Sequence, residues 1–90
     1  MWRVLRRDGS SFQMAKRTPP SSRRILAGNL RRLRLESEMS QDDVAAEAGV
    51  RQALVSAIEV ETANPTLETL DRVAAALGVD LAKLFERTGR

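Results

Sequence analysis

The sequence of 90 residues contains no cysteine, no histidine and no long apolar run. Without cysteine, disulfide bonds and thiolate metal sites are excluded. Without histidine, the chain lacks the side chain that most often serves as a general base or metal ligand near neutral pH. No apolar stretch reaches the roughly 18 residues of a membrane-spanning helix. We therefore expect no enzyme, no metal or other cofactor, and no membrane contact.

Acidic residues are scarce in the first third of the chain. Residues 1–34 hold ten basic residues against Asp8 alone, a net charge of +9, and residues 35–90 carry a net charge of −6. This asymmetry suggests a basic arm on a weakly acidic globule. Such an arm can neutralise phosphates and gain affinity for DNA through counterion release. The alternative is a solvated, arginine-rich tail without a fixed partner.

The composition divides the chain at about residue 21. Residues 1–21 lack apolar periodicity and contain Gly9-Ser10-Ser11 and Pro19-Pro20, so we expect a flexible, disordered basic arm. Residues 22–87 are expected to form one small domain, because a chain of this length has little room for a second core.

The domain shows the periodicity of five short helices and of no strand. Ser21 or Ser22 can cap a helix that runs to about Ser37, with Leu26, Leu30 and Leu33 on its inward face. Two more helices are expected at residues 41–48 and about 52–61. A fourth, capped by Thr66, has an apolar stripe from Leu67 to Leu77, and a fifth, capped by Asp80, carries Leu81, Leu84 and Phe85. The predicted fold class is all-α, a compact five-helix bundle.

Residues 40–59 predict a specific arrangement of two of these helices. Ser40 and Asp43 match a capping box at a helix N-terminus. Gly49 can end that helix in a left-handed conformation, and a second helix follows directly. Two short helices joined by a tight turn form a helix-turn-helix, whose second helix lies in the DNA major groove.

Several ordered motifs extend this match. They are LxxLR at 30–34, SQDDVA at 40–45, AGV at 48–50, VSAIE at 55–59, NPTLETL at 64–70 and VAAALGV at 73–79. With these motifs the chain from Leu26 to about Phe85 resembles the Cro and phage-repressor (XRE-like) helix-turn-helix family. The resemblance implies a lambda-repressor-like DNA-binding domain and a sequence-specific regulator of transcription, expected to be a repressor.

The resemblance also implies roles for single residues. Gln41 matches a glutamine that meets a phosphate, and Gln52 matches the first base-reading position, where glutamine can pair with adenine. Either side chain could instead be merely exposed. Asn64 matches a loop position that often touches the DNA backbone, although it can equally shape the turn. The same DNA-binding surface is expected to include Arg51, Ala53 and Ser56.

The predicted reading helix departs from the family by its shortage of cations. Arg51 stands where the family usually has a Ser or Thr N-cap, and its side chain cannot accept hydrogen bonds from the helix start. Glu61 stands where glycine is usual. The attraction to DNA must then come mainly from the arm and the first helix, and the candidates are Arg17, Arg23, Arg24, Arg31 and Arg32. The sequence leaves open whether the arginines of the first helix face the DNA.

Arg34 and Glu59 match a family pair in which a salt bridge joins the first and third helices. By this analogy the bridge would fix the reading helix against the bundle. The alternative is two solvated charges on separate faces.

A single small domain covers few base pairs, so we expect a homodimer on double-stranded DNA, in contact through Leu84 and Phe85 or through a face of the fourth helix. The alternative function is a protein-interaction module, such as the antitoxin half of a toxin–antitoxin pair. The shortage of cations and the apolar Leu54 and Val60 favour that alternative. We expect a cytoplasmic, nucleoid-associated protein.

Overall fold

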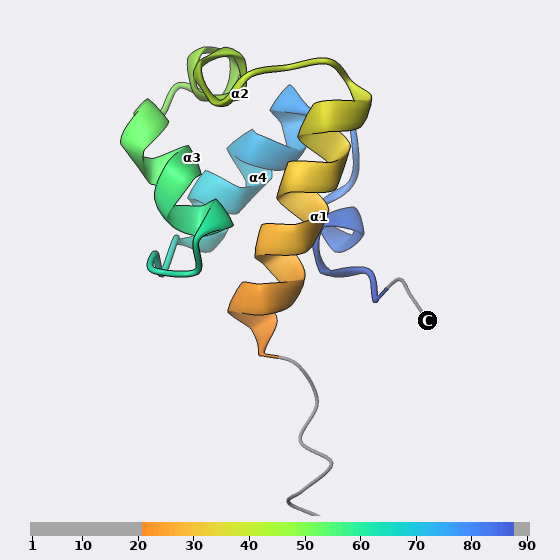
Figure 1. The fold of residues 1–90 in the computed structure, drawn as a ribbon. Helices are drawn as coiled ribbons and strands as arrows, with labels where there is room; N and C mark the ends of the chain where they lie inside the picture. The colour runs from red at the N-terminus through yellow and green to blue at the C-terminus, as the bar shows by residue number, and fades with distance from the viewer. Residues whose placement is uncertain (1–20, 88–90) are drawn as a thin grey trace, which may run out of the picture.

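Four α-helices and one short 3₁₀ helix make up residues 21–87, the part of the chain that the computed structural model describes (Figure 1). The α-helices are α1 (Ser22–Glu36), α2 (Gln41–Ala48), α3 (Gln52–Glu59) and α4 (Leu67–Ala76), and the 3₁₀ helix η2 spans Leu81–Phe85. No strand occurs in this part of the chain, so the all-α class is confirmed. The predicted arm, apart from Ser21, lies outside the described residues, and so does Arg17.

The helix starts follow from local capping. The hydroxyls of Ser21, Ser40 and Thr66 each accept a hydrogen bond from the backbone N–H three residues on, as predicted for α1, α2 and α4. At α2 the carboxylate of Asp43 also accepts from the Ser40 N–H, at 2.9 Å, which completes the capping box. The hydrogen bond from the Ser40 N–H to the carboxylate lowers the pKa of Asp43, and interaction of the carboxylate with the Ser40 hydroxyl lowers it further.

The last helix corrects the sequence prediction. We expected an α-helix capped by Asp80, but the Asp80 side chain makes no capping hydrogen bond and the segment forms a 3₁₀ helix of five residues. It is held from outside: the Asn29 side-chain amide donates to the carbonyl oxygens of Leu84 at 2.9 Å and Glu86 at 2.8 Å. Asn29 is buried in α1, and the apolar periodicity gave no indication of this contact.

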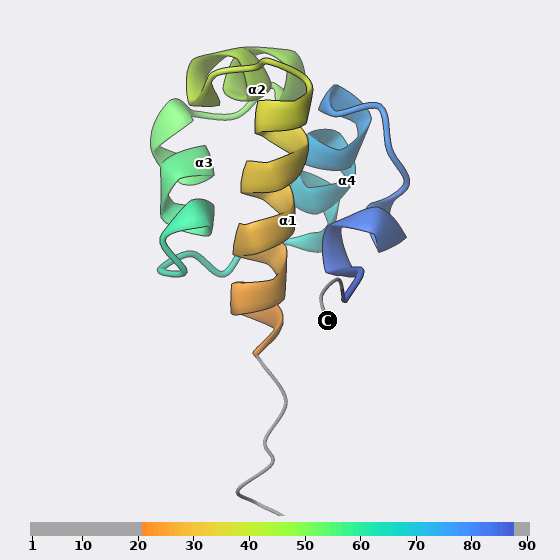
Figure 2. The ribbon, with the colours of Figure 1, turned by 45° about the vertical axis from the view of Figure 1, so that its right-hand side comes forward.

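All five helices contribute to the core, and α2 packs against α3 and α4. In Figure 2 α1 stands between α3 and η2. Leu30, Val44, Val55, Val73 and Leu84 have no exposed surface. Burial of each such side chain contributes about 1.5–3 kcal/mol relative to exposure, so the bundle is stabilised mainly by these contacts.

Three predictions about apolar residues need correction. Leu84 is fully buried in the chain's own core, so it cannot form the dimer contact that we expected of it. Leu67 was placed in the inward stripe of α4, but 70% of it is exposed, because it is the first residue of the helix and points away from the core. Leu54, expected near the surface, packs against the core.

All four α-helices end in the same backbone motif. An N–H beyond the last turn donates back into the helix, from Met39 to Arg34, Val50 to Ala45, Thr62 to Ala57 and Val79 to Ala74. This Schellman motif needs a residue with positive φ just before the donor. Gly49 and Gly78 occupy that position after α2 and α4, as predicted.

Glutamates occupy the same position after α1 and α3. Glu38 has φ 58° and Glu61 has φ 67°, close to the 72° and 71° of the two glycines. A residue with a Cβ is disfavoured in this conformation by roughly 1–2 kcal/mol. The turn at Glu61 also ends α3 at Glu59, two residues earlier than predicted.

We predict that Glu61→Gly and Glu38→Gly each stabilise the fold by about 1 kcal/mol, because glycine adopts the left-handed conformation without steric penalty. The midpoint of urea unfolding should rise in both variants with an unchanged m-value.

Gly78→Ala is the matched control. A Cβ at Gly78 would meet no atom within 4 Å, so a loss of stability there reports the backbone conformation alone. Unchanged midpoints in both glutamate variants would show that the left-handed turns carry no strain.

Candidate nucleic-acid interface

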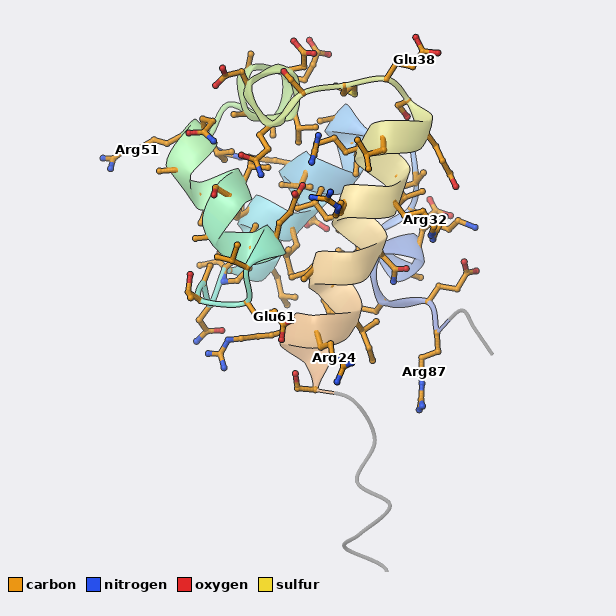
Figure 3. The ribbon with its side chains drawn as sticks, viewed as in Figure 1. Arg24, Arg32, Glu38, Arg51, Glu61 and Arg87 are labelled. Carbon is orange, nitrogen blue, oxygen red and sulfur yellow. The ribbon has the colours of Figure 1, made fainter. Side chains whose placement is uncertain are left out.

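α3 packs one face into the bundle and leaves the other open. Val55 and Ile58 are buried, whereas Gln52 and Ala53 are exposed. Ser56, one turn beyond Gln52 on the same side, is half-buried. Arg51, just before the helix, extends away from the molecule (Figure 3). The structure thus brings the four residues that we predicted to read DNA onto one surface.

The start of α3 has no side-chain cap. Arg51 occupies the N-cap without a side-chain hydrogen bond, and its carbonyl oxygen accepts from the N–H groups of Leu54 at 3.0 Å and Val55 at 3.4 Å. The first N–H groups of a helix have no partner inside it. Those of α3 therefore face outward beside a guanidinium group, an arrangement that favours negative charge.

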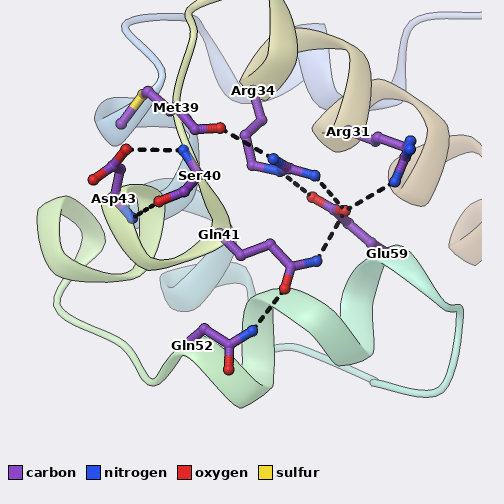
Figure 4. Close-up of polar contacts among 8 residues, drawn as sticks. All are labelled: Arg31, Arg34, Met39, Ser40, Gln41, Asp43, Gln52 and Glu59. Atoms are coloured by element: carbon purple, nitrogen blue, oxygen red, sulfur yellow. Dashed lines mark hydrogen bonds and ion pairs between the residues drawn. The ribbon is translucent and has the colours of Figure 1, made fainter.

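A chain of polar side chains connects α1 to this surface (Figure 4). Arg34 donates from Nε to Glu59 Oε2 at 2.7 Å and from Nη2 to Oε1 at 3.0 Å, and its Nη1 donates to the Met39 carbonyl at 3.0 Å. Gln41 Nε2 donates to Glu59 Oε1 at 3.1 Å. Gln52 Nε2 donates to Gln41 Oε1 at 2.6 Å. The salt bridge between Arg34 and Glu59 is present, and its side chains are only 9% and 3% exposed.

The carboxylate of Glu59 sets the direction of this chain. Because an ionised carboxylate only accepts, Gln41 must turn its NH₂ group toward Glu59. Its carbonyl oxygen then faces Gln52, which must donate. Among the described residues, the second N–H and the Oε1 of Gln52 have no partner, and these are the groups with which glutamine pairs with adenine.

Glu59 stays ionised at neutral pH. Burial alone would raise the pKa of its carboxyl group, but the hydrogen bonds from Arg34 and Gln41 and the charges of Arg34 and Arg31 outweigh burial. The pKa of Glu59 consequently lies below its ordinary value of 4.5. The hydrogen bond to Glu59 also raises the pKa of Arg34. The polarity of the chain of hydrogen bonds is therefore fixed.

The arginines of α1 point to two different sides. Arg31 Nη1 lies 4.0 Å from Glu59 Oε1, with 64% of its side chain exposed, so it lies beside α3. Arg32 points toward η2, where it contacts Glu36 Oε2 at 3.4 Å and Asn29 Oδ1 at 3.2 Å. Arg31 and Arg32 were both candidates for attracting DNA, and only Arg31 lies beside α3.

The other predicted residues lie at the N-terminal end of α1. Arg23 Nε donates to the Ala63 carbonyl at 3.0 Å and so contacts the loop between α3 and α4. Arg24 is exposed at the same end (Figure 3). Asn64 is exposed in that loop. Gln41 and Gln52, in contrast, lie at the starts of α2 and α3.

Within residues 21–87, no group of three or more metal-binding side chains is placed to hold an ion. No helix in this part is long and apolar enough to cross a membrane. The arrangement described above offers hydrogen-bond donors and positive charge at the surface.

Two helices joined by a tight turn, the second exposed along its length, define a helix-turn-helix protein. The profile of the HTH_3 family, described as helix-turn-helix, matches residues 30–84, more than half of the chain. The chain belongs to this family, and it is a DNA-binding transcriptional regulator.

Individual relatives agree with this assignment. The uncharacterised HTH-type transcriptional regulator y4dJ of Sinorhizobium fredii is 38% identical over 66 residues, which are 73% of this chain and 86% of that protein. The solved structure of the hypothetical transcription factor NHTF from Neisseria has a TM-score of 0.72 at 34% identity, and the match covers 76% of this chain and 80% of that one.

A third relative has a different name. The antitoxin HigA1 of Mycobacterium tuberculosis is 43% identical over 63 residues, which are 70% of this chain. The match covers only 42% of the antitoxin, so the likeness is confined to less than half of that protein.

We predict that Glu59→Gln destabilises the fold at neutral pH by about 3–5 kcal/mol, because Arg34 is left buried without its counter-charge. Since the folded-state pKa of Glu59 is lowered, the carboxylate's contribution is complete above about pH 4.5 and is lost as the pH falls through the folded-state pKa. The difference between wild type and variant should therefore narrow in acid. Urea unfolding between about pH 7 and pH 2 measures it.

Glu68→Gln provides the control. Its ion pair with Arg72 is exposed, so this substitution should change stability by about 0.5 kcal/mol or less. A difference between wild type and Glu59→Gln that stays constant over the whole pH range would contradict the role of the ionised pair.

Proposed function

We propose that the protein recognises a specific double-stranded DNA sequence with α3 in the major groove and acts as a repressor. The observation that carries this proposal is the hydrogen bond between Gln41 and Gln52, which holds a base-reading amide at the exposed start of α3. Side chains held in one rotamer lose less entropy on binding. Repression is the simplest consequence, because a domain bound over a promoter excludes other proteins from it.

The contacts divide into base reading and phosphate binding. The free N–H and Oε1 of Gln52 suit adenine, and the methyl group of Ala53 suits the methyl group of thymine. Ser56 offers a hydroxyl to a base edge or a phosphate. Gln41 has one side-chain N–H left after its bond to Glu59, and with its backbone N–H at the start of α2 it can bind a phosphate.

The distribution of ion pairs supports this orientation. Three cations on the other surfaces have acidic partners, since Arg32 pairs with Glu36, Arg72 with Glu68, and Lys83 with Glu86. The exposed Arg87, also on another surface, has none among the described residues. Near α3 and its following loop, Arg23, Arg24 and Arg51 have no acidic partner among the described residues, and Arg31 has only the 4.0 Å contact with Glu59. With Arg17, these are the groups that we propose to bind phosphates.

We further propose that two copies bind together. One α3 reads few base pairs, so a homodimer would place two reading helices about 34–36 Å apart, in successive major grooves. The exposed apolar side chains Leu35, Val60 and Leu67 are available for the contact between copies. Sedimentation with and without DNA tests this proposal, and a monomer in both conditions would contradict it.

The proposed role is binding, without catalysis, and it would be carried out in the cytoplasm, where the DNA of the nucleoid lies. The first experiment is a fluorescence anisotropy titration that compares DNA from upstream of the protein's own gene with scrambled DNA at several salt concentrations. A preference that persists at raised salt supports sequence-specific regulation. Equal, steeply salt-dependent binding to both DNAs argues against it.

A second candidate is the antitoxin of a toxin–antitoxin pair. The similarity to HigA1 and the exposed Val60 favour it. Co-purification with the product of an adjacent gene, followed by the same DNA titration, tests this role. The two roles are compatible, because the apolar residue lies beyond the end of α3 and leaves its reading face open.

We predict that Gln52→Ala weakens binding by about 1–3 kcal/mol at one base position and relaxes specificity there. Gln41→Ala should have a similar but smaller effect, because Gln52 loses the group that orients it. Selection of binding sites from a randomised library measures both. An unchanged sequence preference in Gln52→Ala would refute this assignment.

A further inference from the structure

We infer that Arg23 is a positioning residue that presents Asn64 to the DNA backbone and shares a phosphate with it. This inference rests on the proposed DNA-binding function. Arg23, in the first turn of α1, donates a 3.0 Å hydrogen bond from Nε to the carbonyl oxygen of Ala63, forty residues further along the chain. Ala63 directly precedes Asn64, which is exposed.

Residues 60–66 form the loop between α3 and α4, and hydrogen bonds to α3 hold its first half. The N–H of Glu61 donates to the Ile58 carbonyl, and Thr62 donates to the Ala57 carbonyl from both its N–H, at 2.9 Å, and its hydroxyl, at 3.3 Å. These bonds complete the end of the helix and fix the backbone as far as Thr62.

The second half of the loop is held by the packing of Ala63 against the core and by one hydrogen bond from Arg23. Among the hydrogen bonds of residues 21–87, the one from Arg23 is the only one that joins residues 63–65 to another part of the bundle. Ala63 and Pro65 are half-buried, so Asn64 is the exposed residue of this half. The hydrogen bond from Arg23 is thus the polar contact through which α1 can influence the direction of Asn64.

The same bond brings positive charge to the loop. In both views of the ribbon the loop lies beside the N-terminal end of α1 (Figures 1 and 2). The contact with Ala63 uses only the Nε–H of Arg23, so the N–H groups on Nη1 and Nη2 remain available. A phosphate at this edge can accept hydrogen bonds from the guanidinium and from the amide of Asn64 together.

A double-mutant cycle in DNA binding tests this inference. Arg23→Ala should weaken binding to operator and scrambled DNA alike, by about tenfold, and should lower the slope of log K against log salt by about 1. Asn64→Ala added to Arg23→Ala should then have little further effect. Asn64→Ala alone should weaken binding measurably.

Arg24→Ala is the matched control, because it removes the same charge from the next residue of α1, and Arg24 has no side-chain bond to the loop within the described residues. Its effect should add fully to that of Asn64→Ala. Arg23→Lys is the second variant: it should keep the salt slope, but it should lose the coupling to Asn64 because it lacks the Nε–H. Circular dichroism of each variant confirms that it is folded.

Full additivity of Arg23→Ala and Asn64→Ala would overturn the inference, and so would identical behaviour of Arg23→Ala and Arg24→Ala. In either case, if the wild-type protein still prefers the upstream DNA over scrambled DNA, the proposed function is supported. A wild-type protein that binds neither DNA would overturn both.

Discussion

The carboxylate of Glu59 is the group on which the reading face depends. It accepts hydrogen bonds from α1 and α2 while it lies on α3, so a single buried charge ties three helices together. A pair of apolar side chains could fill the same volume, often with no loss of stability. Such an apolar pair could not orient the side-chain amide of Gln41, as the carboxylate of Glu59 does. Because acceptors and donors alternate from Glu59 outward, the charge in the interior determines which atoms of Gln52 are available to a base.

The parts of the fold that were predictable from the sequence are those specified locally. The limits of α2 were predicted correctly because a capping box opens it and Gly49 closes it within one short window. The same holds for the hydroxyl caps of α1 and α4, and for the uncapped start of α3 at Arg51. Each of these features needs only neighbouring residues in the sequence, so a pattern of a few letters is sufficient evidence.

The rest depends on contacts between distant segments. The end of η2 is held by Asn29, 55 residues before Leu84, and nothing within the segment itself predicts this contact. Which of Arg31 and Arg32 lies beside α3 depends on how α3 packs against α1. The bond between Gln41 and Gln52 has the same origin: both residues were singled out, but their contact requires the crossing of α2 over α3.

The four identical helix ends also bear on how this protein can change over time. Two of them carry glutamate in a conformation that glycine adopts freely, so by our prediction the same backbone would be more stable with glycine there. A single nucleotide change converts a glutamate codon to a glycine codon. Such a substitution would raise the stability of the fold. A more stable domain would tolerate destabilising substitutions in α3 that change the DNA sequence it recognises.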